Sequence, residues 1–177
     1  GERVLVLGGS GAVGSFAVQL AAHRGAEVTA ACSAGKRDFV LALGAHRALD
    51  YGAVPLAEMG GPFDVIVDIA GNRAISGLRS ALTPEGRLVI VGGEAGGPLL
   101  GGVQRNLLAT VADRFTRREL GWFFSRTTAQ GCARLAELVP VGAVSPAVDR
   151  KVGLAGAASA LAAMERGELR GQAVVCL

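Results

Sequence analysis

Residues 4–14 read Val4-Leu-Val-Leu-Gly-Gly-Ser-Gly-Ala-Val-Gly14, and this stretch decides the fold of the chain. An apolar run typical of a buried strand leads into Gly9, Gly11 and Gly14, which have the spacing G-x-G-x-x-G. We expect Gly9 to allow a tight turn, Gly11 to let the backbone approach a pyrophosphate, and Gly14 to let the following helix pack against the strand. The helix N-terminus then offers N–H groups and a positive dipole end to an anion.

The elements on either side of the glycines decide what the motif means. The spacing alone is a weak signal, but here it lies between a strand and an apolar helical segment, Phe16–Ala22. That context predicts a dinucleotide-binding site. Its candidate cofactor-binding residues are Gly9, Ser10, Gly11, Ala12, Val13 and Gly14. The alternative is a glycine-rich turn in some other α/β protein.

Composition narrows the class of protein. The chain has 177 residues, of which 50% are hydrophobic, and this is enough for one well-buried domain. No apolar run reaches the roughly 18–20 residues of a membrane span, so we expect no membrane partner. The chain enters a strand at Arg3, so we expect no signal peptide. Cys32, Cys132 and Cys176 have neither zinc-site nor disulfide spacing, which favours a reducing, cytoplasmic location.

The net charge of +3 comes with a basic cluster in the second half of the chain. The cluster has no interleaved base-stacking aromatic residues and no recognised nucleic-acid motif. We therefore expect a solvated or partner-covered face and no nucleic-acid partner. Its members are Arg105, Arg114, Arg117, Arg118 and Arg126.

Strands and helices alternate through the first half of the chain. The expected strands are near-continuous Val/Ile/Leu runs, which is typical of parallel strands covered on both faces. We predict an α/β fold, a doubly wound parallel sheet (Rossmann fold) in three layers, α/β/α. The expected strands are Arg3–Gly8, Glu27–Ala31, Arg47–Leu49, Asp64–Ile69 and Arg87–Val91; the helices are Ala12–Arg24, Lys36–Leu43 and Arg73–Leu82; a turn is expected over Thr83–Gly86.

The second half has a different character and begins with a glycine-rich loop. Pro146 interrupts one of the strands that we expect there. The expected elements are a loop over Glu94–Gly102, helices over Val103–Phe115, Ala129–Val139 and Leu154–Arg166, and strands over Leu120–Ser125, Val144–Val148 and Ala173–Leu177.

The end of the second strand indicates which dinucleotide is bound. NAD-preferring folds place an acid there for the ribose 2′-OH, but Ala30–Arg37 contains none. Ser33 can donate a hydrogen bond, and Lys36 and Arg37 supply the charge that a 2′-phosphate requires. The segment therefore favours NADP (NADPH) over NAD. The alternative is that these cations belong to a solvated first helical turn.

Several motifs together resemble the medium-chain dehydrogenase/reductase superfamily, in its quinone oxidoreductase-like or zinc-type alcohol dehydrogenase-like branches. The matches keep their order along nearly the whole chain. They are Gly8-Gly-Ser-Gly-Ala-Val-Gly14, Phe16-Ala-Val-Gln-Leu20, Leu43-Gly-Ala45, Leu49-Asp-Tyr51, Phe63-Asp-Val-Ile-Val-Asp68, Gly86-Arg-Leu-Val-Ile-Val-Gly92 and Gly171-Gln-Ala-Val-Val175.

This resemblance implies further cofactor-binding residues. Lys36 and Tyr51, with Ser33 beside them, match positions that bracket the adenosine 2′-phosphate. Positions after the fourth strand match the wall beside the ribose, and positions after the fifth match the backbone near the nicotinamide. These two sets are Ile69, Ala70 and Gly71, and Val91, Gly92 and Gly93. For Tyr51 the alternative is an ordinary half-buried loop residue, and for Gly92-Gly93 a plain strand-ending turn.

The resemblance also implies a substrate domain before the glycine motif, which is absent from this sequence. We expect a Rossmann domain over residues 1–143 and, over 144–177, a segment that in relatives returns to the substrate domain and here has little to pair with. His23 and His46 are single, so we expect no metal. No catalytic residue is assigned; Ser125, Thr127 and Thr128 are candidates for a general acid by residue type alone.

These expectations favour the NADPH-binding domain of an oxidoreductase that transfers hydride to a quinone, enone or carbonyl substrate, inactive as this chain alone. The alternatives are a non-catalytic NADPH-binding or sensing module and a methyltransferase-like fold. The basic Ser33–Arg37 segment argues against the latter, because an acid there usually holds the ribose of the methyl donor. The aromatic strand Leu120–Ser125 predicts a sheet edge through which a homodimer forms, unless a local helix covers it.

Overall fold

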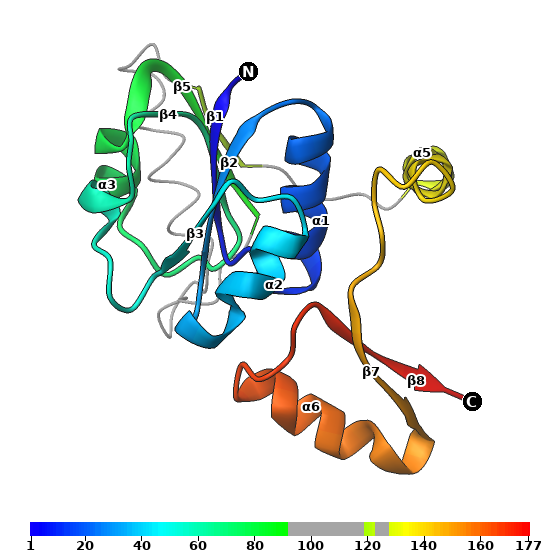
Figure 1. Ribbon diagram of the computed structural model, residues 1–177. Helices are drawn as coiled ribbons and strands as arrows, with labels where there is room; N and C mark the ends of the chain where they lie inside the picture. Colours follow the sequence, from blue (N-terminus) through cyan, green and yellow to red (C-terminus); the bar gives the residue numbers. More distant parts are fainter. Residues whose placement is uncertain (92–118, 123–127) are drawn as a thin grey trace.

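A six-stranded parallel sheet forms the centre of the molecule (Figure 1). The computed structural model describes residues 1–91, 119–122 and 128–177. The strand order is β3-β2-β1-β4-β5-β6. After β3 the chain returns to the other side of β1 to add β4, as in doubly wound dinucleotide-binding folds. The predicted fold class is therefore confirmed. The strands are β1 Arg3–Leu7, β2 Glu27–Cys32, β3 Arg47–Asp50, β4 Phe63–Asp68, β5 Leu82–Ile90 and β6 Glu119–Trp122.

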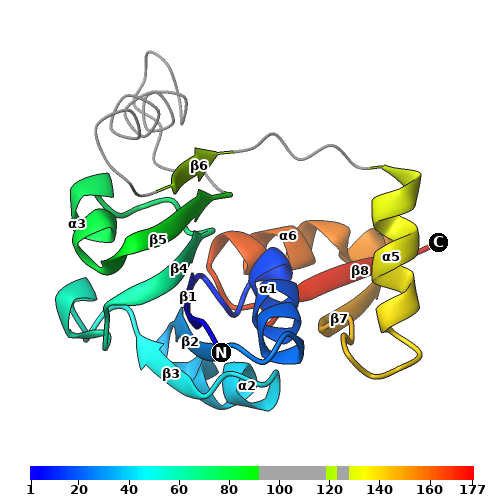
Figure 2. The ribbon, with the colours of Figure 1, turned by 90° about the horizontal axis from the view of Figure 1, so that it is seen from above.

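Helices cover both faces of this sheet (Figures 1 and 2). Side chains alternate between the faces along β1. Val4 and Val6 join the core under α1 (Ala12–His23) and α2 (Arg37–Ala42), whereas Leu5 and Leu7 join the core under α3 (Ile75–Ser80). The apolar runs of β1 and β2 are continuous because both faces of these strands are buried. Short 3-10 turns, η1 Ala34–Lys36 and η2 Leu56–Glu58, precede α2 and β4.

The predicted turn at Thr83–Gly86 is wrong, because these residues lie inside β5. Leu82 pairs with Phe63 and Arg87 with Val65, so the extra residues form an irregularity in the strand rather than a break before it. Glycine fits at position 86, where a Cβ would lie 3.0 Å from the Phe63 carbonyl oxygen. The turn-forming residue types therefore produce a bulge.

The strand predicted over Val144–Val148 is also misplaced. β7 spans Val148–Gly153 instead. Pro146 has no backbone N–H for a strand ladder, and the backbone N–H and C=O of Ser145 both bond to the side chain of Gln19 on α1. The backbone before β7 is thus used to attach the C-terminal part to the sheet domain.

Residues 144–177 form a small unit beyond the carboxyl ends of the central strands (Figure 1). β7 pairs in parallel with β8 (Gln172–Cys176), and η3 (Leu154–Gly156) and α6 (Ala157–Glu165) connect them. The expectation that this segment has little to pair with is wrong, because its own two strands pair with each other. Before it, α5 (Ala129–Leu138) is capped by Thr128 Oγ1, which accepts from Gly131 N at 3.0 Å.

Several predictions lie outside the described residues: the loop Glu94–Gly102, the helix Val103–Phe115, the basic cluster from Arg105 to Arg126, and the final part of the predicted strand Leu120–Ser125. In the part of the chain that the structure describes, no helix has the length and apolar character that a membrane span requires.

Candidate cofactor-binding site

The glycine turn joins β1 to α1 with two close backbone approaches. Gly8 has a left-handed φ of +87°, and a Cβ there would lie 3.3 Å from Ala70 N. The conformation that favours glycine thus occurs at Gly8, one residue before the position that we predicted. Gly9 has another role, because a Cβ added to it would lie 3.1 Å from the Ala30 Cβ.

Gly14 and Gly11 differ in how much space surrounds them. A Cβ at Gly14 would lie 2.0 Å from the Gly8 carbonyl oxygen, so α1 packs directly on the turn, as the motif predicts. At Gly11 the nearest such atom is 3.6 Å away, which leaves that side open. The first N–H groups of any α-helix lack intrahelical partners, and the N-cap of α1, Gly11, has no side chain that could accept from them. This geometry suits a phosphate.

A pocket of about 340 Å³ opens beside this turn, at the carboxyl ends of β1, β2 and β4. It brings together seven of the predicted residues: Ser10, Gly11, Ser33, Lys36, Tyr51, Ile69 and Ala70. These residues come from four separate loops. Because ligands of open α/β sheets bind outside the carboxyl ends of the strands, the pocket is the candidate cofactor site.

The remaining predicted residues do not line this pocket. Gly9, Ala12, Val13 and Gly14 belong to the turn and the first turn of α1. Gly71 lies beyond the wall, where its N–H donates to the fully buried Asp68 Oδ1 at 3.0 Å. Val91 follows β5, and Gly92 and Gly93 lie outside the described residues.

Six residues of the wall were missed by sequence reasoning. Three belong to the ends of β1 and β2 or the turn after β1, and three lie further along the chain: Leu7, Gly8 and Ala31, and Asn72, Arg73 and Gly167. Asn72 and Arg73 follow β4 directly, so their position beyond a carboxyl strand end was an available signal. Arg73 Nη2 donates to the Tyr51 carbonyl oxygen at 3.1 Å, which ties the loops after β4 and β3 together. Gly167 had no such signal, since it lies far along the chain in the C-terminal unit.

Lys36 brings a positive charge to the part of the pocket that follows β2. Its Nζ donates to the carbonyl oxygens of Gly167 and Leu169, at 2.7 and 2.6 Å. Burial lowers the pKa of Lys36; Arg170 also lowers it, while Cys32 and Asp149 raise it. An ammonium group has three hydrogens, so these two bonds leave one for an anion.

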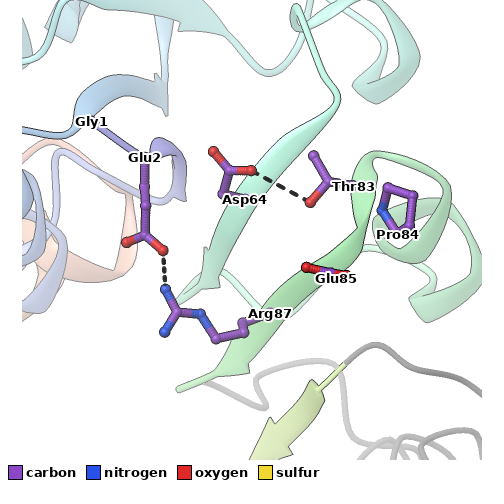
Figure 3. Close-up of a pocket in the computed structure, with 7 residues that line it drawn as sticks. All are labelled: Gly1, Glu2, Asp64, Thr83, Pro84, Glu85 and Arg87. Atoms are coloured by element: carbon purple, nitrogen blue, oxygen red, sulfur yellow. Dashed lines mark hydrogen bonds and ion pairs between the residues drawn. The ribbon is translucent and has the colours of Figure 1, made fainter.

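A larger, open hollow of about 980 Å³ lies at the opposite end of the strands (Figure 3). Its residues come from the amino ends of β1, β4 and β5, with Glu2 paired to Arg87, and Thr83 Oγ1 3.5 Å from Asp64 Oδ1. Because the amino ends of the strands are remote from the glycine turn and from the carboxyl strand ends, we do not assign this hollow to the cofactor.

With the geometry described, the chain can be compared with known proteins. A family described as zinc-binding dehydrogenase matches residues 43–175. The chain belongs to this family. It is thus a member of the medium-chain dehydrogenase/reductase superfamily, as the resemblance implied.

Relatives of this zinc-binding dehydrogenase domain are longer than the chain. The mitochondrial NAD(P)H oxidoreductase RTN4IP1 of Danio rerio is 31% identical over 99% of this chain and 49% of its own length. A putative alcohol dehydrogenase from Sinorhizobium meliloti is 31% identical, with a TM-score of 0.83, over 99% of this chain and 48% of that one. The quinone oxidoreductase from Coxiella burnetii is 26% identical, with a TM-score of 0.81, over 100% and 53%. The chain spans about half the length of the curated relatives it matches.

Because the family is described as zinc-binding, we looked for side chains that could hold a zinc ion. Within residues 1–91, 119–122 and 128–177, no group of three or more His, Cys, Asp or Glu side chains is placed to hold a metal ion. His46 Nδ1 accepts a hydrogen bond from Val28 N at 3.2 Å, so that nitrogen is already engaged. The described residues do not fit a zinc site, and we derive no zinc chemistry from them.

Proposed function

We propose that this chain is the NADPH-binding domain of an oxidoreductase. The observation that carries the proposal is the single pocket that joins the glycine turn to Lys36 and Ser33, beyond a second strand whose end has no acid. A carboxylate at that position would bind a ribose 2′-OH and repel a 2′-phosphate. The side chains present here suit the phosphate instead.

Each part of the pocket suits one part of the cofactor. The N–H groups at the start of α1 would bind the pyrophosphate, and Gly11 leaves room for its close approach. Ser33, Lys36 and Tyr51 would surround the 2′-phosphate, and Ile69 and Ala70 would contact the ribose. When bound, the nicotinamide supplies the hydride, and the protein supplies orientation and electrostatics.

We propose that the substrate is a quinone, enone or carbonyl compound. The support is family membership together with the names of the relatives, which include a quinone oxidoreductase and a putative alcohol dehydrogenase. Because we expect this chain alone to be inactive, the test is consumption of NADPH by a longer form of the protein on addition of a quinone or enone. NADPH binding by that longer form with no oxidation by any of these acceptors would favour the alternative, a non-catalytic NADPH-binding or sensing module.

Fluorescence titrations with NADPH and NADH test the cofactor assignment. We expect NADPH to bind at least about tenfold more tightly, since charge-assisted bonds to a phosphate contribute about 1.5–3 kcal/mol. Lys36→Met should remove most of this difference. Lys151→Met is the matched control, because Lys151 is the other lysine of the chain and lies exposed on β7. Equal binding of NADH and NADPH by the unchanged protein would contradict the assignment.

We also propose the division into a Rossmann domain, residues 1–143, and a segment, residues 144–177, that contacts a substrate domain. Support comes from the exposed apolar side chains of α6 and from relatives of about twice the length. Limited proteolysis tests this contact. If the contact forms, α6 should be cleaved more slowly in a longer form that includes the substrate domain than in this chain. Cleavage in α6 at the same rate in both forms would contradict it.

A homodimer is a further proposal. β6 ends the six-stranded sheet in the described structure, and an unpaired edge is a template for pairing with a second copy. Light scattering at tens of micromolar protein tests this, and a monomeric mass would contradict it.

A further inference from the structure

The C-terminal unit contacts both phosphate-binding elements of the candidate site. Gly171 N donates to the Ser10 carbonyl oxygen of the glycine turn at 2.8 Å, and Gly171 forms a parallel bridge with Gly11. Four residues earlier, Gly167 forms part of the pocket wall. The loop 167–171 therefore connects the pocket wall to the glycine turn.

The same loop holds Lys36 in place. A lysine side chain has many rotamers, and ordering one costs up to about 2 kcal/mol. Here the Gly167 and Leu169 carbonyl oxygens, at 2.7 and 2.6 Å from Nζ, fix the ammonium group before any ligand arrives. Leu169 is itself buried, which anchors the loop. Binding of an anion to Lys36 would then require little further ordering.

Arg170 brings a second cation to this place. Its Nη2 donates to the Gly35 carbonyl oxygen at 3.2 Å, directly beside Lys36 in the chain. In the described part of the chain no carboxylate forms an ion pair with Arg170, while the neighbouring Glu168 pairs with Arg166 and Arg150. The charge of Arg170 lowers the pKa of Lys36, so the two cations lie close enough to repel each other, and Asp149 offsets this repulsion at Lys36 without forming an ion pair with either cation in the described residues. A dianionic phosphate would relieve the repulsion further.

We propose that the C-terminal loop completes the 2′-phosphate site: Gly167 and Leu169 position Lys36, and Arg170 is a specificity-determining cation for NADP. This inference rests on the proposed NADPH-binding function. If it is correct, the loop after β2 and the loop before β8 together set the cofactor preference.

The experiment compares 2′,5′-ADP with 5′-AMP as ligands, because their affinity ratio isolates the 2′-phosphate. Arg170→Gln should weaken 2′,5′-ADP by about threefold to tenfold, as expected for one partly exposed charge-assisted contact, and leave 5′-AMP unchanged. Arg170→Lys should restore part of the loss. Arg134→Gln is the control for net charge, because Arg134 is exposed on α5, whereas Arg170 contacts the Gly35 carbonyl oxygen beside Lys36. Thermal unfolding of each variant establishes that the fold is intact.

The outcomes separate this inference from the proposed function. If the unchanged protein prefers 2′,5′-ADP but Arg170→Gln behaves like Arg134→Gln, the role of Arg170 is wrong and the NADPH assignment stands. If Arg170→Gln weakens both ligands equally, Arg170 acts on the fold of the site and not on the phosphate, which also overturns the inference. If the unchanged protein shows no preference for 2′,5′-ADP, the proposed function itself fails.

Discussion

The central sheet and the C-terminal unit are both made of parallel strands joined by helices, but they bury their side chains very differently. Val4–Leu7 of β1 are all buried, at 5% exposure or less. In the C-terminal unit nearly every residue of β7 is exposed, as are Leu161 and Met164 on α6, at 54% and 57%. On α6 itself the buried residues are the small Ala160 and Ala163.

The two regions are therefore held in place by different interactions. The sheet is stabilised by apolar burial on both faces, at about 25 cal/mol per Å². The C-terminal unit is attached by specific hydrogen bonds: Gln19 to Ser145, Lys36 to Gly167 and Leu169, and Gly171 to Ser10. Mutations in the two regions should therefore have effects of different size and kind.

The largest effect is expected where the glycine turn and α1 touch. Gly14→Ala places a Cβ 2.0 Å from the Gly8 carbonyl oxygen, and neither backbone can yield without moving α1 off the sheet. We expect a loss of more than about 4 kcal/mol in the free energy of unfolding, measured by chemical denaturation. Gly11→Ala is the control, since its Cβ would have 3.6 Å of space. Similar stability of the two variants would contradict the tight approach.

A pair of apolar truncations compares the two cores directly. Ile66→Ala removes a fully buried side chain from β4 and should cost about 2–5 kcal/mol, since it leaves a cavity. Leu161→Ala removes an exposed side chain from α6 and should change the free energy of unfolding by less than about 0.5 kcal/mol. A large loss for Leu161→Ala in this chain would mean that the C-terminal unit has a core of its own.

The attachment of the C-terminal unit is tested at Gln19. Gln19→Leu keeps the volume but leaves the Ser145 N–H, now 2.7 Å from Gln19 Oε1, without its acceptor. We expect a cost of about 1–3 kcal/mol and faster hydrogen exchange of residues 144–153 than of the central strands. Gln130→Leu, at an exposed position of α5, serves as the control. Unchanged exchange in residues 144–153 would argue against this attachment.

The smallest perturbation is chemical labelling of the cysteines. Cys132 and Cys176 are exposed, whereas Cys32 is buried at the end of β2. Burial and the nearby Asp50 raise the pKa of the Cys32 thiol, against the opposing effect of Lys36 and Arg37. A raised pKa means less thiolate at neutral pH, so Cys32 should react with a thiol reagent far more slowly than the other two. Labelling of all three at one rate in the native protein would contradict this.

The sequence predicted the sheet well, and in the C-terminal unit it predicted β8 and the helical segment Leu154–Arg166 to within one residue at each end but misplaced β7. Strands buried on both faces leave continuous apolar runs such as Val4–Leu7, and a glycine after such a run indicates the turn. β7 is almost wholly exposed, so it carries no comparable pattern, and it was predicted several residues too early. Turn-forming residues at Thr83–Gly86 gave the wrong structure because a parallel partner, β4, holds them within a strand.

Local pattern by itself determined the alternation of strands and helices, the doubly wound fold, the family and most of the pocket. These follow from the sequence because neighbouring residues specify them: a glycine spacing, an acid-free strand end, an apolar run. The tertiary structure alone decided that Gly167, Leu169 and Arg170 meet the loop that contains Lys36, across separations of 131 to 135 residues. Contacts through backbone carbonyls leave no trace in side-chain types, so only the folded chain reveals them.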